Sequence, residues 1–367
     1  MTTPDALQFI PQMQPWFDDR EKEALSKYME TGGWITEFTK TKEFAQAIAD
    51  YTGTKYCSIL SNGTVTLTAA LIAMGIGKND EVIVPDYTMI ASANAVLMAG
   101  ATPVFADVER ATMCLDLESL KSKVTPATKA IMLVSINGRY PAKLDEMIRF
   151  CRGKGLKIVE DAAQSLGSFF NNKHVGTFGD IGSFSFSMPK IITTGQGGAL
   201  ITDNEELYHN IELVRNFGRE NAGIDKHVFY GVNFKFTDLQ AVVGIEQMRK
   251  ISERVRLKRE IFKALRDQLS GVREVEFLQT SDEVTPWFND VLVQQRDALQ
   301  VSLKQKMIGS RPFYPAVHTQ APYNITSTLY PHAEYFAGNG LWLPSYAQLS
   351  DSELDRIVKA IKEFYNK

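Results

Sequence analysis

Two hydrophobic patterns alternate along the chain between residues 55 and 202. Short runs rich in Val, Ile and Leu, typical of buried strands, are followed by stretches with apolar residues at three- and four-residue steps, typical of helices. Strands are predicted at residues 55–60, 80–85, 102–108, 129–136, 156–161, 182–186 and 197–202, and helices at 64–76, 89–101 and 144–155. This alternation predicts an α/β fold whose mostly parallel central sheet is covered on both faces.

The pattern changes after about residue 240. A long charged amphipathic helix is predicted over 239–269, followed by weaker strand signals and a terminal helix over 350–365. The terminal helix opens with Ser350 and Glu353, which have the spacing of a capping box. We therefore predict a large α/β domain with the N-terminal segment, residues 1–240, and a smaller C-terminal α+β domain, residues 241–367.

Charge and composition narrow the class of partner. The net charge is −3, and the densest basic run, Arg249–Glu260, is interrupted by acids, which favours a solvated helix face over a polyanion site. No segment approaches the roughly 18 apolar residues of a spanning helix, and the first residues lack the pattern of a secretory leader. We expect no nucleic-acid or membrane partner and a cytoplasmic location.

The three cysteines, Cys57, Cys114 and Cys151, lie far apart and lack the spacing of zinc ligands. They suit a reducing compartment, and we expect neither a disulfide framework nor a metal site.

Asp161 ends the apolar strand at 156–161, at the edge where open α/β sheets bind ligands. A carboxylate there can hold the protonated ring nitrogen of a pyridine cofactor. Gln164 would lie within reach of the same ring if a helix begins at Asp161. The alternative, equally open from this motif, is that Asp161 only caps that helix.

The segment Ser61–Leu67 joins a predicted strand to a helix. Ser61, Asn62, Gly63 and Thr64 are all residues typical of turns and helix caps. The N–H groups and dipole of such a helix start can bind a phosphate, although for this motif alone an ordinary capped helix is the better explanation.

Lys190 lies in the segment "FSFSMPKIITTGQGGAL", with no acidic residue within six positions on either side. Apolar surroundings disfavour the ammonium form, so the amine can act as a nucleophile. A buried lysine paired with a distant carboxylate is the alternative. Glycines after Lys190 allow a sharp turn, and Ser185 before it could donate its hydroxyl to a phosphate.

Together, a phosphate site, a strand-end acid and a lysine, in that order on a parallel sheet, meet the needs of pyridoxal 5′-phosphate (PLP). The cofactor requires an anchor for its phosphate, an acid at its ring nitrogen and an amine for its aldehyde.

The sequence also resembles the DegT/DnrJ/EryC1/StrS family of sugar aminotransferases over nearly its whole length. The motifs that carry this resemblance include "TGGWIT", "SNGT", "VEDAAQSLGSFFNNKHVGTFGDIGSFSF", "KIITTGQGG" and "GVNFKFTDLQAVVG". It implies the architecture of PLP-dependent transferases of fold type I, which is aspartate-aminotransferase-like, and a homodimer with shared active sites.

The resemblance also implies roles for individual residues. Lys190 and Asp161 match the catalytic lysine and the partner of the ring nitrogen. The other implied cofactor contacts are Gly63, Thr64, Gln164, Ser185 and, from the partner subunit, Asn233. The implied substrate contacts are Arg311, Tyr314 and His318, and Arg139 and Lys235 are further candidates for binding phosphates.

Several positions depart from the family pattern. The usual GEGG is GQGG with Gln196, and Met89 stands where an aromatic residue often stacks on the ring, so Tyr87 or the Met89 thioether is expected to take that place. The other departures are Ser135, Phe217, Val232 and, again, Arg139 and Lys235. None of them is Lys190 or Asp161.

The motifs "PDYTMIASAN", "PKIITTG" and "SRPFYPAVHTQAPY" are most similar to the branch that aminates GDP-4-keto-6-deoxymannose at C4. The resemblance therefore implies amino transfer, with glutamate as donor, to C4 of a nucleotide-linked 4-keto-6-deoxysugar. Transfer to C3, transfer to a small phosphorylated ketone, and a binding or regulatory protein without turnover are the alternatives. A branch that removes a sugar hydroxyl has histidine in place of the lysine, and Lys190 argues against it.

Overall fold

The computed structural model describes residues 8–221, 224–326 and 329–366. Its seven-stranded sheet has the order β1-β9-β8-β5-β4-β2-β3, and β9 runs antiparallel to both of its neighbours. The strands are β1 (Tyr56–Leu60), β2 (Glu81–Pro85), β3 (Thr102–Ala106), β4 (Thr128–Val134), β5 (Lys157–Asp161), β8 (Ile181–Ser185) and β9 (Gly198–Thr202). The predicted α/β fold with a mostly parallel sheet is confirmed.

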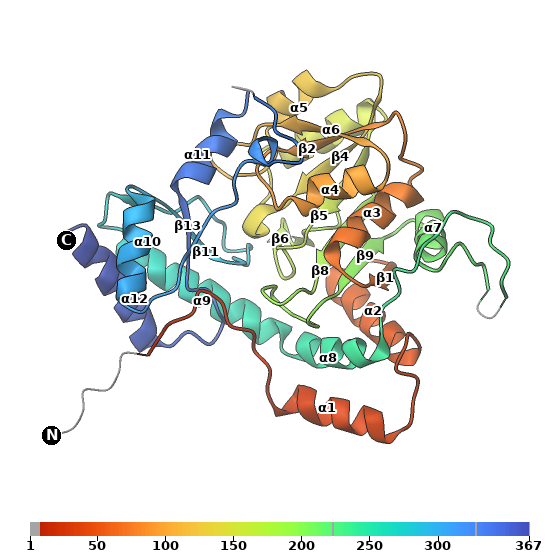
Figure 1. The fold of residues 1–367 in the computed structure, drawn as a ribbon, viewed down its shortest axis with the longest axis horizontal. Coiled ribbons are helices and arrows are strands. Elements are labelled where there is room, and N and C mark those ends of the chain that lie inside the picture. The colour runs from red at the N-terminus through yellow and green to blue at the C-terminus, as the bar shows by residue number, and fades with distance from the viewer. Residues whose placement is uncertain (1–7, 222–223, 327–328, 367) are drawn as a thin grey trace.

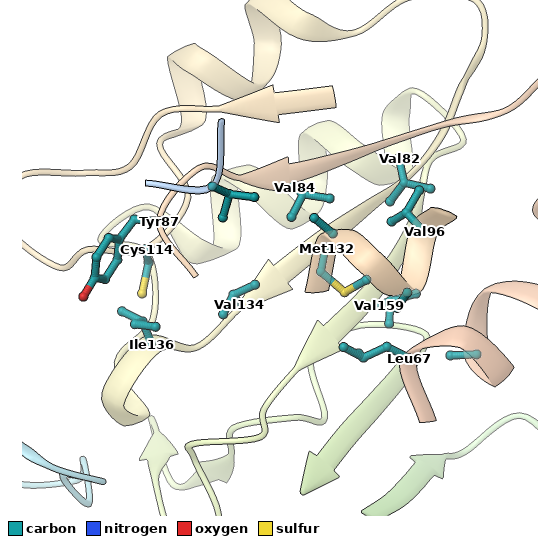
Figure 2. Packing of buried hydrophobic residues seen from close by; sticks show 14 of the residues in the cluster. Leu67, Val82, Val84, Tyr87, Val96, Cys114, Met132, Val134, Ile136 and Val159 are labelled. Carbon is teal, nitrogen blue, oxygen red and sulfur yellow. The ribbon is translucent and has the colours of Figure 1, made fainter. Parts of the chain in front are cut away.

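Helices cover both faces of this sheet (Figure 1). Figure 2 shows Val82 of β2 beside Val96 of a covering helix, and Val84 belongs to the same core, whereas Ile83 between the two valines belongs to the opposite core. This alternation along one strand is why the strands are apolar throughout. One face is covered by α3 (Gly63–Ala73), α4 (Ala91–Met98) and α7 (Glu205–Arg215), and the other by α2 (Thr39–Thr52), α5 (Leu117–Lys123), α6 (Leu144–Gly153) and α8 (Asp238–Arg249).

A second, antiparallel sheet has the order β10-β11-β13-β12. Its strands are β10 (Val275–Glu276), β11 (Asn289–Val293), β12 (Arg311–Pro312) and β13 (Gly340–Leu343), with the helices α9 (Ile251–Leu269), α10 (Arg296–Gln305), α11 (Pro331–Asn339) and α12 (Asp351–Phe364) around it. The capping box of Ser350 and Glu353 forms as predicted. Ile10, from the N-terminal segment, is buried in this second core, and the division of the chain at residue 240 stays a prediction.

The remaining elements are short or peripheral. They are α1 (Asp19–Glu30), the hairpin of β6 (Phe169–Phe170) and β7 (Lys173–His174), and the 3₁₀ turns η1 (Ile136–Gly138) and η2 (Val317–Thr319).

The single helix predicted over 239–269 is wrong, because the chain breaks at Lys250 into α8 and α9. The Lys250 N–H bonds the Gln247 carbonyl three residues back, which tightens the turn. Its side chain is buried against Asp18 and Glu21 of the α1 region, at Nζ–O distances of 3.0 and 2.5 Å. These contacts fix the bend between the two cores.

The solvated face predicted for Arg249–Glu260 is also wrong in part. Lys250, Arg254 and Lys258 are buried on one side, while Arg249 and Arg256 lie outside. Residues four apart share a helix face, and this face packs between the two cores instead of facing water.

Within the described ranges, no helix is long and apolar enough to cross a membrane. Over the same residues, no group of His, Cys, Asp or Glu side chains is arranged to hold a metal ion. Cys57, Cys114 and Cys151 are buried and free.

Candidate active site

A cavity of about 680 Å³ opens where β5 and β8 of the large sheet end. It is lined by nine of the predicted site residues, which are Gly63, Thr64, Met89, Asp161, Gln164, Ser185, Lys190, Arg311 and Tyr314. Most come from loops at the carboxyl ends of parallel strands, where open α/β sheets bind ligands. Arg311 and Tyr314 come from the second sheet and the loop after it, so both sheets contribute to the wall.

Asp161 is the last residue of β5 and is buried at the cavity floor. Its Oδ2 accepts a hydrogen bond of 2.6 Å from the Ser92 hydroxyl, and its Oδ1 accepts one of 3.2 Å from the Ala163 N–H. Burial raises the pKa of the Asp161 carboxyl, while Ser92 and the nearby Lys190 charge lower it. A turn, and not a helix, follows Asp161, so the helix-cap alternative does not hold.

Lys190 lies in the loop between β8 and β9 and is partly exposed to the cavity. Desolvation lowers the pKa of its amine to about 8, and the charge of Asp161 acts in the opposite direction. An amine with this pKa is present in both protonation states near neutral pH, as a group that both accepts and returns a proton requires.

The N-terminus of α3 forms one end of the cavity. The Asn62 side chain caps this helix by accepting from the N–H groups of Thr64 and Val65, both at 3.0 Å. Gly63 allows a close approach, because a Cβ at this position would lie 2.7 Å from the Ser185 Cβ. A helix start next to two hydroxyl residues, Thr64 and Ser185, is an environment suited to a phosphate.

Gln164 is held by the turn after β4. Its Oε1 accepts a hydrogen bond of 2.6 Å from the Asn137 N–H. Asn137 itself exchanges two hydrogen bonds with the backbone of Phe288, and its φ of 52° is in the left-handed region that Asn tolerates. The turn therefore connects the cavity floor with the chain that enters the second sheet.

Two predicted residues are buried outside the cavity. Tyr87 is packed among Phe313 and Phe336, and Figure 2 shows it beside Cys114 and Ile136, so it is not available to stack on a ring in the cavity. Met89, the other residue considered for that place, does line the cavity. His318 pairs through Nδ1 with Asp86 at 2.6 Å, and burial raises the pKa of the Asp86 carboxyl to about 6.

Three further predicted residues also lie away from the cavity. Arg139 is buried, and its guanidinium forms a bidentate pair with Asp290 at 2.6 and 2.8 Å, so its donors are directed into the core. The Lys235 ammonium lies 4.6 Å from the centre of the Phe217 ring. Asn233 is exposed and forms an isolated antiparallel β-bridge with Asn216.

The sequence interpretation missed two residues, Ser92 and Trp287. Ser92 lies four residues after Thr88, and their hydroxyls are 2.9 Å apart, so a helical spacing of two hydroxyl residues was the available signal. Trp287 lines the cavity with its ring centre 4.2 Å from Lys190 Nζ. It lies 97 positions away in the chain, and no local pattern connects the two residues.

These residues fit PLP. A buried carboxylate, an amine of lowered pKa and a helix start beside Ser185 line one cavity, and the missing Cβ at Gly63 leaves room at its phosphate end. Asp161 would hold the ring nitrogen, Lys190 the aldehyde, and Gly63, Thr64 and Ser185 the phosphate.

The fold and this site define a PLP-dependent aminotransferase. The chain belongs to the DegT/DnrJ/EryC1/StrS aminotransferase family, whose model matches residues 16–362. It is therefore a PLP-dependent sugar aminotransferase.

Among individual proteins, the chain is 32% identical to the GDP-perosamine synthase of Escherichia coli O157:H7, over 98% of this chain and 100% of that protein. It is 34% identical to the GDP-perosamine synthase of Caulobacter vibrioides, over 95% of this chain and 96% of that protein. The solved structure of S. venezuelae DesV, in complex with a ketimine intermediate, matches with a TM-score of 0.89 and 28% identity, over 95% of each chain.

Proposed function

We propose that this enzyme transfers the amino group of glutamate to C4 of a nucleotide-linked 4-keto-6-deoxysugar, as a GDP-perosamine synthase would. The observation that supports it most is the meeting of Lys190 and Asp161 in one cavity that Arg311 and Tyr314 of the second sheet also line. The similarity to GDP-perosamine synthases over nearly the full chain favours a nucleotide sugar over a small phosphorylated ketone.

PLP, when bound, supplies the electron sink that carries an amino group from donor to acceptor. In this proposal, Lys190 Nζ removes the proton from the α-carbon of glutamate and, in the second half-reaction, delivers a proton to C4 of the sugar. Asp161 would keep the ring nitrogen of the bound cofactor protonated, and Ser92 holds that carboxylate by a hydrogen bond of 2.6 Å. The donor leaves as a 2-oxo acid and the sugar ketone becomes an amine.

Arg311 is the proposed contact for the anionic part of the substrate. It is exposed at the cavity, and its guanidinium carbon lies 5.8 and 5.5 Å from the ring centres of Tyr314 and Trp342. Ring faces orient a guanidinium without neutralising it, so its charge stays available to a phosphate. Arg139 and His318 are not among the proposed contacts, because Asp290 and Asp86 hold them in the core.

A homodimer with shared sites is part of the proposal. Asn233 and Lys235 lie outside the cavity of their own chain, where they could reach a partner's site. Large apolar side chains are exposed in the neighbouring segments, with Trp34 68% and Tyr230 74% accessible, which supports a subunit interface at this surface.

The free, buried cysteines support the proposed cytoplasmic location.

The first experiment is an absorption spectrum of the purified protein with PLP, before and after glutamate is added. The expected result is an absorption band of protein-bound PLP, near the short-wavelength end of the visible range. This band should disappear when glutamate is added and return with GDP-4-keto-6-deoxymannose. NMR of the product then identifies the carbon that carries nitrogen. Amination at C3, or return of the band only with a phosphorylated ketone, would contradict the proposed substrate. A spectrum that does not respond to any amino donor would favour the alternative of a binding or regulatory protein without turnover.

The matched variants Arg311→Met and Arg139→Met test the substrate contact. We expect Arg311→Met to raise the KM for the nucleotide sugar about 10- to 100-fold at unchanged thermal stability, because a charge-assisted contact is lost. Arg139→Met should lower stability by about 3–5 kcal/mol, because it leaves Asp290 buried without its partner. An unchanged KM in Arg311→Met would remove Arg311 from the site.

Subunit mixing tests the shared sites. Lys190→Ala and Asn233→Ala subunits, each expected to be nearly inactive alone, should regain roughly a quarter of the wild-type activity after mixing, because half of the dimers then contain one intact site. A mixture as inactive as its components would contradict a contribution of Asn233 across the interface.

A further inference from the structure

Lys190 is held on both sides through the backbone. The carbonyl before it, of Pro189, accepts a hydrogen bond of 2.6 Å from the indole N–H of Trp287, and the carbonyl after it, of Ile191, accepts one of 3.3 Å from the Arg254 guanidinium. The Lys190 N–H itself bonds the Ser187 carbonyl at 3.0 Å. The loop is therefore fixed, and the remaining freedom of the residue lies in its side chain.

That side chain ends over the face of Trp287. The distance from Lys190 Nζ to the ring centre is 4.2 Å, within the range at which an aromatic face attracts an ammonium group. A neutral amine is attracted far less, so this contact favours the protonated form. It opposes the desolvation that favours the neutral form.

The position of Trp287 is in turn well determined. Its ring stacks on Phe288 at 3.8 Å between centres and meets Trp342 of β13 edge-on at 5.9 Å. Asn137 fixes the backbone of Phe288 by two hydrogen bonds, and Asn137 also holds Gln164. Trp287 thus reaches the cavity from a rigid aromatic cluster at the entry to the second sheet.

We propose that Trp287 is a positioning residue of the active site, whose ring face holds the Lys190 amine in its protonated form at the cavity wall while its N–H fixes the neighbouring carbonyl. Between proton transfers, a lysine amine that is free must stay near the reacting carbon and keep access to both protonation states. The contact with Trp287 gives the ammonium group a second favourable neighbour besides the charge of Asp161. This inference rests on the proposed role of Lys190.

The test uses the full-length chain freed of cofactor, so it does not depend on turnover. Competitive acetylation with acetic anhydride between pH 6 and 10, read by mass spectrometry of each lysine peptide, reports the neutral fraction of every amine. We compare the wild type with Trp287→Leu, which removes the ring, and Trp287→Phe, which keeps a smaller aromatic face and loses the N–H. Trp342→Phe changes the same aromatic cluster without touching Lys190 and is the matched control.

In Trp287→Leu, we expect Lys190 to be acetylated roughly three- to fivefold faster at pH 7, because more of the amine is neutral once the aromatic face is removed. Trp287→Phe should lie between Trp287→Leu and the wild type, and Trp342→Phe should stay close to the wild type. Lys258 serves as an internal reference, since its buried amine is acetylated only when the structure opens.

Two results would overturn the proposal. One is a Trp287→Leu protein in which the pH dependence of Lys190 labelling matches the wild type. The other is faster labelling of Lys258 in parallel with Lys190, because the variant would then have loosened the whole domain junction. Should the enzyme prove to have a different activity, the labelling result still decides whether the ring controls this amine.

Discussion

Lys190 and Lys258 invite comparison because desolvation lowers the pKa of both amines, to about 8 and about 7. Lys258 lies on α9, is buried between the two cores and donates a hydrogen bond of 2.6 Å to the Ser345 carbonyl. The charge of Arg254 lowers the pKa of Lys258 further. Lys190 instead faces a cavity, with a carboxylate that raises its pKa and an aromatic face beside it.

The difference shows that a perturbed pKa alone does not identify a reactive lysine. Both amines lose hydration, but of the two residues only Lys190 also lines a ligand-sized cavity, which it shares with the carboxylate of Asp161. Lys258 has a structural role: its side chain packs between the two cores, which tolerate the amine because a backbone carbonyl accepts its hydrogen bond. Substitutions at and around the two lysines should separate these two roles.

The largest effect is expected for Lys190→Ala. Its turnover should fall by at least about 10³-fold, because the variant lacks both the attachment point for PLP and the proton carrier. Its thermal stability should stay within about 1 kcal/mol of the wild type, since the side chain faces a cavity. Single-turnover assays and thermal melts measure the two quantities, and a variant that turns over normally would refute the assignment of Lys190.

Asp161→Asn should lower turnover by about 10²–10⁴-fold, because an amide cannot keep the ring nitrogen protonated. The negative charge of Asp161 raises the pKa of Lys190, so its removal should move the pH dependence of Lys190 acetylation to lower pH. Lys258 should be labelled as in the wild type. An unchanged Lys190 profile would mean that the two groups do not interact.

Lys258→Met should leave turnover nearly unchanged and raise the stability by about 1–3 kcal/mol at pH 6, since the variant no longer buries a charge. Because the pKa of Lys258 is lowered on folding, the unfolded chain binds more protons than the folded one between pH 7 and about 10.5. The free-energy cost of burying the Lys258 charge in the wild type therefore decreases as the pH rises through that window. Denaturant titrations should therefore give a gain that shrinks by pH 10. A gain independent of pH would contradict the burial of the Lys258 charge as its cause.

The smallest effect is expected for Ser92→Ala, which removes one hydrogen bond from Asp161. The Ser92 hydroxyl lowers the pKa of that carboxyl, so the variant should lose activity about three- to tenfold, most strongly at low pH where Asp161 becomes protonated first. The acidic limb of the pH–rate profile should shift upward. A uniform loss across the whole pH range would point to a packing effect instead.

The sequence by itself determined the seven strands of the large sheet, the helices α3, α4 and α6 between them, the capped terminal helix, and the candidates Lys190, Asp161 and the turn at Gly63. These features depend on residue types within a few positions, on hydrophobic periodicity, and on the rule that parallel strands present ligands at their carboxyl ends. Most of the site residues could be predicted from the sequence because they lie in the loops that follow such strands.

Only the tertiary structure decided which cations face the cavity and which are held in the core. Arg311 and Arg139 are the same residue type in the sequence, yet Asp290, 151 positions from Arg139, directs Arg139 inward. The bend at Lys250, the burial of Tyr87 and the meeting of Trp287 with Lys190 likewise depend on partners distant in the chain. Burial and pairing are properties of the folded neighbourhood, and hydrophobic periodicity reports only the face on which a residue lies.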